Sequence, residues 1–178
     1  ILSSDNNALE FLKKYRNEIF GKVPVVFGGI NNYNPSMLEG HEKYTGVAES
    51  ISYEKNIQLI LKLNPAVKNI FFVNDYLKTG RIFAQEMQDI SRKYKDKVRI
   101  IYNENSSFSD LKIKISQLEK NTVILLGAYY SDKNNQYIEY ADMAKELLEI
   151  TALPVYSTTE FAITHNIIGG HVISSFSQ

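Results

Sequence analysis

Apolar and polar residues alternate in blocks along most of the chain, and the blocks have the lengths of strands and helices. From residue 69 onward, the runs NIFFV (69–73), VRIIY (98–102) and TVILL (122–126) are largely apolar. Runs of this length, rich in Val, Ile and Phe, predict buried strands. The segments between them carry apolar residues at helical spacing and predict amphipathic helices. A short strand is predicted at Val155, and the segment TTEFAITHNIIGGHVIS (158–174) predicts a short helix, a Gly-Gly turn and a last strand.

This alternation decides the expected fold class. Strands that are apolar on both faces and are separated by amphipathic helices are typical of a parallel sheet covered by helices on both sides. The sequence therefore predicts an α/β fold with a parallel sheet over residues 69–156, flanked by helices.

The first third of the chain shows the same pattern once. A helix is predicted from apolar residues at helical spacing, with Ser4 or Asp5 placed to cap it. Its apolar positions are Ala8, Leu12, Tyr15 and Ile19. The run VPVVFGGINNYN (23–34) predicts a buried strand that ends in a glycine pair. The polar segment 35–52 is predicted to be a connection or hinge.

Composition removes several classes of function. The 178 residues contain 20 Lys and Arg and 20 Asp and Glu, so no net charge attracts nucleic acid or an anionic membrane. Cysteine is absent, which excludes disulfides, thiolate metal sites and cysteine nucleophiles. No apolar run approaches the roughly 18 residues of a membrane span. A membrane link is expected only through segments outside this sequence, and nucleic acid is not an expected partner.

The strand ends are the candidate binding positions, because ligands of open parallel sheets bind beyond the carboxyl ends of the strands. Strand-end loops are often rich in Asn, Ser and Gly for turns and caps alone, but two adjacent tyrosines directly after a buried strand are less ordinary. Asp75 and Glu160 are candidate counterions for an ammonium group, and a tyrosine could stack on a planar portion. The predicted ligand-binding residues are Asn31, Asn32, Asp75, Tyr76, Tyr129, Tyr130, Thr158, Thr159 and Glu160.

Catalytic signatures are missing from the sequence. It has no Gly-x-x-x-x-Gly-Lys phosphate loop, no Gly-x-Gly-x-x-Gly opening a helix and no Gly-x-Ser-x-Gly elbow. His41, His165 and His171 match no common zinc spacing. We predict no catalytic residue, no metal site and no cofactor, and hence a protein that is not an enzyme. A doubly wound hydrolase or transferase is the alternative, and the predicted site residues include neither His nor Lys to act as its base.

Three segments resemble a known family. YTGVAESISYEKNIQLILKLNPAVKNIFFVND (44–75) is similar to the signature of ABC-transporter substrate-binding proteins of the periplasmic-binding-protein-like type I fold. There, a Thr-Gly-Val hinge precedes a helix, a Leu-x-Pro turn and the first strand of the second lobe. LPVYSTTEFAITHNIIGG (153–170) resembles the return crossover of that family. The opening segment 3–34 is similar to versions in extracytoplasmic sensor regions of bacterial histidine kinases and diguanylate cyclases.

The resemblance implies two lobes that close on a small organic solute. Lobe two would be residues 53–153, with hinge crossovers at 47–52 and 154–157. Lobe one would combine both ends of the chain, 1–46 plus 158–178. It would be partial, since the family's first strands and helices would precede Ile1. Upstream chain or a neighbouring molecule would cover the exposed sheet, which allows a homodimer.

The same resemblance implies a function and a location. The expected function is an extracytoplasmic ligand-binding sensor domain, periplasmic or extracellular, that signals to a membrane-linked output domain. Its ligand would be an amino acid or a related carboxylate. The alternatives are the solute-binding component of an ABC transporter, and an interaction domain whose cleft is vestigial.

Overall fold

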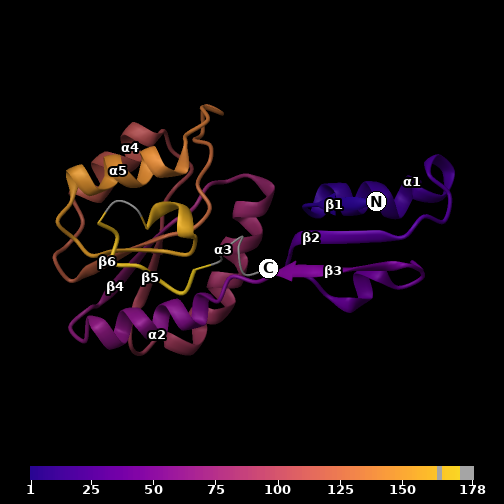
Figure 1. Ribbon diagram of the computed structural model, residues 1–178. Helices are drawn as coiled ribbons and strands as arrows, with labels where there is room; N and C mark the ends of the chain where they lie inside the picture. The colour runs from indigo at the N-terminus through magenta and orange to yellow at the C-terminus, as the bar shows by residue number, and fades with distance from the viewer. Residues whose placement is uncertain (164–165, 173–178) are drawn as a thin grey trace. The chain divides into compact units, whose positions relative to one another are not determined.

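A computed structural model describes residues 1–163 and 166–172 of the chain. The described residues form two compact units, each with its own parallel sheet: unit 1 spans residues 1–50, and unit 2 spans residues 51–172 (Figure 1). No helix within the described part of the chain is both long and apolar enough to span a bilayer.

Unit 1 is a small three-stranded parallel sheet with the order β1-β2-β3. Helix α1 connects β1 to β2, and the Asp5 carboxylate caps it by accepting from the Asn7 N–H at 3.2 Å. Leu9, Phe27 and Ile30 form its core. The elements are β1 (Leu2–Ser4), α1 (Asn6–Ile19), β2 (Val25–Asn31), the 3-10 turn η1 (Pro35–Leu38) and β3 (Tyr44–Glu49).

Strand β3 was not predicted. It lies inside the segment 35–52 that the sequence pattern assigns to a connection, and it overlaps the predicted hinge 47–52. Most of its residues are exposed, so it has no apolar run to mark it as a strand. It is identified only by its parallel pairing with β2, from Val25 opposite Tyr44 to Asn31 opposite Glu49.

Unit 2 confirms the predicted parallel sheet flanked by helices. Its four strands are all parallel, in the order β5-β4-β6-β7. The strands are β4 (Asn69–Val73), β5 (Arg99–Tyr102), β6 (Thr122–Leu126) and β7 (Val155–Ser157). The helices are α2 (Tyr53–Leu63), α3 (Lys78–Ser91), α4 (Phe108–Ser116) and α5 (Tyr140–Ile150), with short 3-10 turns η2 (Arg92–Tyr94) and η3 (Glu160–Ala162).

The sheet of unit 2 separates two hydrophobic cores. Phe72 packs with the buried residues of α2 and α3, whereas its neighbour Phe71 packs with those of α4 and α5. Figure 1 shows α4 and α5 on one side of this sheet and α2 on the other. Adjacent strand residues point to opposite faces, so both must be apolar where helices cover both faces. This is why the strands are readable as continuous apolar runs.

The structure places the segment after β7 differently from the prediction. The described residues of 158–172 belong to unit 2, whereas the sequence assigned 158–178 to lobe one. Residues 154–157, predicted as a hinge, include strand β7. The Ser157 N–H donates to the Gly169 carbonyl at 2.9 Å, and the Ile168 N–H donates to the Val155 carbonyl at 3.0 Å. Backbone pairing of this kind leaves no hydrophobic period in the sequence. His165 and the end of the predicted last strand lie outside the described residues.

The side chain of Asn56, on α2, forms hydrogen bonds with the backbone of the segment that follows β7. Asn56 is fully buried. It accepts from the His171 N–H at 2.9 Å and donates to the carbonyls of His171 at 3.0 Å and Ser52 at 3.1 Å. One amide therefore ties the start of α2 to residues 170–171.

We predict that Asn56→Ala destabilises unit 2 by about 2 kcal/mol, because the backbone N–H and carbonyl of His171 lose their buried partner. Chemical denaturation measures this as a lower midpoint with an unchanged slope. Asn105→Ala, at an exposed position, is the matched control and should leave the midpoint in place. Equal midpoints for the two variants would contradict the proposed tie.

Candidate ligand-binding site

The carboxyl ends of the four parallel strands of unit 2 meet at one edge of its sheet, called the strand-end edge below. Asp75 and Tyr76 follow β4, the pair Tyr129 and Tyr130 follows β6, and Thr158 begins the segment after β7. Thr159 and Glu160 continue that segment. The structure thus brings all predicted site residues to this one edge except Asn31 and Asn32, which lie in unit 1.

Asp75 is buried, with 3% of its surface exposed. Its Oδ1 accepts from the Leu77 N–H at 3.1 Å, and its Oδ2 accepts from the Tyr130 N–H at 3.0 Å. Burial raises the pKa of Asp75, and the two backbone N–H groups from Tyr130 and Leu77 partly oppose that rise. The sequence predicts Asp75 as an exposed counterion. The structure shows that its carboxylate instead joins the loops that follow β4 and β6.

The two adjacent tyrosines lie in different environments. Tyr129 is 2% exposed, and its ring centroid lies 6.0 Å from that of Phe108. Burial first, then the nearby carboxylates of Asp132 and Asp75, raise the pKa of Tyr129 to about 12. Tyr130 is 37% exposed, with its ring centroid 5.8 Å from that of Tyr140. Tyr130 therefore presents the accessible ring of the pair.

The segment after β7 directs most of its polar groups into the protein. Thr158 is fully buried, and both its hydroxyl and its N–H donate to the Leu126 carbonyl, at 3.1 and 3.0 Å. The Ser157 hydroxyl donates to the Thr159 carbonyl at 2.9 Å and accepts from the Thr159 N–H at 3.0 Å. Thr159 and Glu160 are partly exposed. Of the three predicted residues here, Thr158 serves the fold.

Three residues outside the prediction complete the edge at β4 and β5. The Asn74 N–H donates to Asn103 Oδ1 at 2.8 Å, and the Tyr76 hydroxyl donates to the Asn103 carbonyl at 2.8 Å. Arg81, in the first turn of α3, donates from Nε to the Tyr76 carbonyl at 2.8 Å. Asn74 and Asn103 each follow a strand directly, which is the signal that could have identified them; Arg81 gave none. A pocket of about 130 Å³ lies here, lined by Asn74, Asp75, Tyr76, Arg81, Ala84, Gln88, Tyr102 and Asn103.

In unit 1, the predicted residues Asn31 and Asn32 lie at the carboxyl end of β2. The side chain of Asn6 pairs with the backbone of Asn31, accepting from its N–H at 2.9 Å and donating to its carbonyl at 3.1 Å. Asn32 is exposed and has a φ of 52°, a left-handed conformation that Asn tolerates better than most residues. A turn requirement therefore accounts for Asn32 without a ligand.

The accessible groups of the strand-end edge suit recognition of a small polar molecule. They comprise a phenol ring, hydroxyl and amide groups, and the guanidinium of Arg81, and such groups hydrogen-bond or stack without reacting. Within residues 1–163 and 166–172, no group of three or more His, Asp or Glu side chains could hold a metal ion.

Comparison with solved structures identifies the fold. A conserved domain protein from Vibrio cholerae O1 biovar El Tor aligns over 94% of this chain with a TM-score of 0.60 and 14% identity. An ABC domain from Streptococcus pneumoniae, solved in complex with L-Trp, aligns over 95% with a TM-score of 0.59 and 15% identity. These similarities confirm the predicted α/β fold with parallel sheets flanked by helices. The chain spans 56% of the length of either protein.

Comparison of the sequence with protein-family models and with curated proteins gives no match. The assignment to a sensor or transport family therefore stays a prediction.

We predict that Asp75→Ala lowers the free energy of unfolding by about 1 to 3 kcal/mol, because it leaves the N–H groups of Leu77 and Tyr130 without their buried acceptor. Equilibrium denaturation measures the loss. Asp96→Ala, at an exposed aspartate, should change stability by less than about 0.5 kcal/mol. If both substitutions had the same small effect, Asp75 would not join the two loops.

The raised pKa of Asp75 also predicts a pH dependence. The folded chain binds this proton more tightly than the unfolded chain, so Asp75 favours folding most below its unfolded pKa. That contribution falls as pH rises towards the folded pKa and is constant above it. The stability of the parent minus that of Asp75→Asn should therefore decrease from pH 3.5 upward to a plateau. A difference that grew with pH would mean that hydrogen bonding outweighs burial at this carboxylate.

Proposed function

We propose that this chain is the ligand-binding part of a solute-binding protein and holds a small organic molecule at the strand-end edge of unit 2. One observation carries the proposal: an exposed aromatic ring, Tyr130, lies at the edge where ligands of open parallel sheets bind. The similarity in fold to a domain solved with L-Trp supports it.

The accessible groups favour an amino acid or a related carboxylate. The Arg81 side chain is exposed, and its Nε is fixed on the Tyr76 carbonyl, so its terminal N–H groups can pair with a carboxylate. Tyr130 can stack on a planar side chain. Glu160 is partly exposed whereas Asp75 is buried, so Glu160 is the better candidate for an ammonium group. Contacts from Asn31 and Asn32 remain a prediction from the two-lobed arrangement that the sequence resemblance implies.

The biological role that we propose is that of an extracytoplasmic sensor region linked to a membrane-bound output domain. The resemblance of residues 3–34 to such regions supports this role. Transport is the second candidate, and the description of the Streptococcus neighbour as an ABC domain favours it. In either role the chain binds its solute without turnover, since the predicted site residues include neither His nor Lys to act as a base.

Thermal unfolding in the presence of single amino acids tests this proposal, with L-tryptophan as the first probe. At about 100 times its dissociation constant, a ligand stabilises the folded state by roughly 2.7 kcal/mol, which raises the melting temperature by several degrees. We predict that Tyr130→Ala abolishes this shift while the unliganded melting temperature changes little, because the ring is already partly solvated.

Tyr15→Ala, on α1 of unit 1, is the control and should keep the full shift. The proposal fails if no amino acid or related carboxylate raises the melting temperature of the parent. It fails equally if the Tyr130 variant responds as the parent does.

A further inference from the structure

Asp132 lies two residues after Tyr130 and closes the turn 131–137. It is 7% exposed. Its Oδ1 accepts from the N–H groups of Asn134 at 2.8 Å and Gln136 at 3.1 Å, and an antiparallel bridge joins Ser131 to Tyr137. One carboxylate oxygen thus organises the whole turn.

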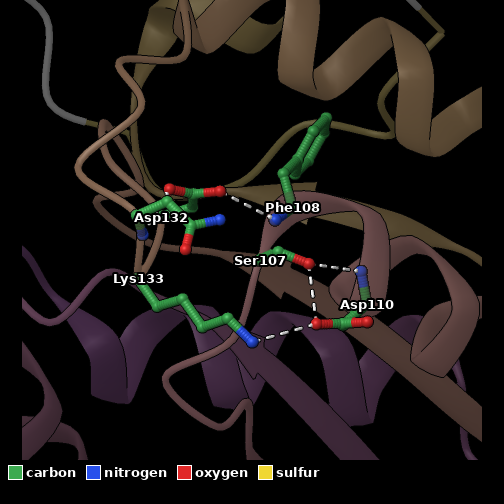
Figure 2. A network of polar contacts seen from close by, with 6 residues as sticks. Ser107, Phe108, Asp110, Asp132 and Lys133 are labelled. Carbon is green, nitrogen blue, oxygen red and sulfur yellow. Dashed lines mark hydrogen bonds and ion pairs between the residues drawn. The ribbon is translucent and has the colours of Figure 1, made fainter.

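The second oxygen of Asp132 reaches a different element. Oδ2 accepts from the N–H of Phe108, the first residue of α4, at 3.3 Å (Figure 2). The Lys133 N–H donates to the Ser106 carbonyl at 3.2 Å, and Lys133 Nζ lies 3.4 Å from Asp110 Oδ2. Figure 2 shows the Asp132–Phe108 and Lys133–Asp110 contacts joining the turn to the start of α4, where Ser107 caps the helix by accepting from the Asp110 N–H at 3.1 Å. The turn and the helix start therefore form one connected assembly.

This assembly holds the tyrosine pair. The Ile138 N–H, just beyond the turn, donates to the Tyr130 carbonyl at 3.0 Å. The ring of Phe108, whose N–H is bound by Asp132, packs against the ring of Tyr129. On the opposite side, Asp75 binds the Tyr130 N–H. The backbone of Tyr130 is thus fixed at its carbonyl through the Asp132 turn and at its N–H through Asp75.

Asp132 is suited to this task because it remains ionised. Burial alone would raise its pKa, but three backbone N–H groups and the nearby Lys133 ammonium outweigh burial and lower the pKa of Asp132 below its ordinary value. An ionised carboxylate has two acceptor oxygens, and both are used here. An amide or hydroxyl side chain at this position could not accept hydrogen bonds on both sides.

We propose that Asp132 is the positioning residue of the candidate site: by joining the 131–137 turn to the start of α4, it holds Tyr130 in place for the solute. It does not contact the solute itself. The inference rests on the proposed function for its consequence in binding, but the hold on Tyr130 can be measured without any ligand.

Two substitutions distinguish the contacts of Asp132 within the turn from its contact with the start of α4. Asp132→Asn keeps an oxygen for the turn, since Asn forms such turns as well as Asp does, but it places an NH₂ group against the Phe108 N–H. Asp132→Ala removes both kinds of contact. Lys120→Gln is the matched control, because it removes an exposed ammonium group that lies outside this assembly, between α4 and β6.

The measurements are amide hydrogen exchange and the ring resonances of ¹³C-labelled tyrosine, with the Tyr130 signal assigned from Tyr130→Phe. In Asp132→Asn, we expect exchange at Phe108 to be about tenfold faster, while Asn134 and Gln136 stay within about threefold of the parent. In Asp132→Ala, all three amides should exchange faster. The Tyr130 resonance should shift in both variants and be unchanged in Lys120→Gln.

Calorimetric titration with L-tryptophan then measures the consequence for binding. Affinity should fall by about tenfold in Asp132→Asn and further in Asp132→Ala, at temperatures where unfolding curves show each variant folded. Unchanged Phe108 exchange and an unchanged Tyr130 resonance in Asp132→Asn would overturn the proposed hold. A moved resonance with undiminished affinity would overturn its role in binding. If the parent does not bind L-tryptophan, the proposed use of that ligand fails, and the resonance alone decides whether Asp132 holds Tyr130.

Discussion

The strand-end edge of unit 2 depends on one buried carboxylate that faces two backbone N–H groups. Asp75 accepts from Leu77 after β4 and from Tyr130 after β6, so two loops from neighbouring strands share one acceptor. The arrangement also dictates the start of α3. A Cβ atom at Gly80 would collide with Asp75 Oδ1 and with the Asp75 carbonyl. The first turn of α3 can therefore pack this closely against Asp75 only because residue 80 is glycine. Burial opposes the charge, yet the hydrogen bonds keep the residue in place.

The same kind of tie extends across the sheet. Asn103 accepts from the Asn74 N–H between β5 and β4, and Thr158 donates to the Leu126 carbonyl between β7 and β6. Most polar side chains at this edge therefore serve the backbone, because buried N–H and carbonyl groups must be paired. Tyr130 and Arg81 have exposed surface at this edge, and they are the residues that we propose for recognition. The polar side chains that pair with the backbone of the strand-end loops are not available to a ligand. Their hydrogen bonds, however, hold the loops that carry the exposed side chains in defined positions.

The sequence predicts the sheet of unit 2 well and its details poorly, for physical reasons. Phe71 and Phe72 are both apolar because helices cover both faces, and that makes β4 readable. Strand β3 is mostly exposed, so its sequence contains no apolar run that would predict a strand. The edge itself follows from parallel topology, but which side chain faces inward does not. Tyr129 and Tyr130 are the same residue type at adjacent positions, so the sequence does not distinguish them. The structure shows that Tyr129 is buried against Phe108 and that Tyr130 is accessible. The placement of 158–172 depends on backbone pairing with Gly169 and on the Asn56 amide, which no hydrophobic period encodes.

The two carboxylates that flank the tyrosine pair are not equivalent. Asp75 accepts two backbone N–H groups and has a raised pKa, whereas Asp132 accepts three, lies near Lys133 and has a lowered pKa. On acidification, Asp75 therefore takes up its proton first, and because burial favours its neutral form, this protonation favours the folded state. Asp132 keeps both acceptors to lower pH. The turn 131–137 and the start of α4 should thus stay joined by an ionised carboxylate at pH values where the carboxyl between the β4 and β6 loops is already neutral, so the two holds on the Tyr130 backbone respond differently to pH.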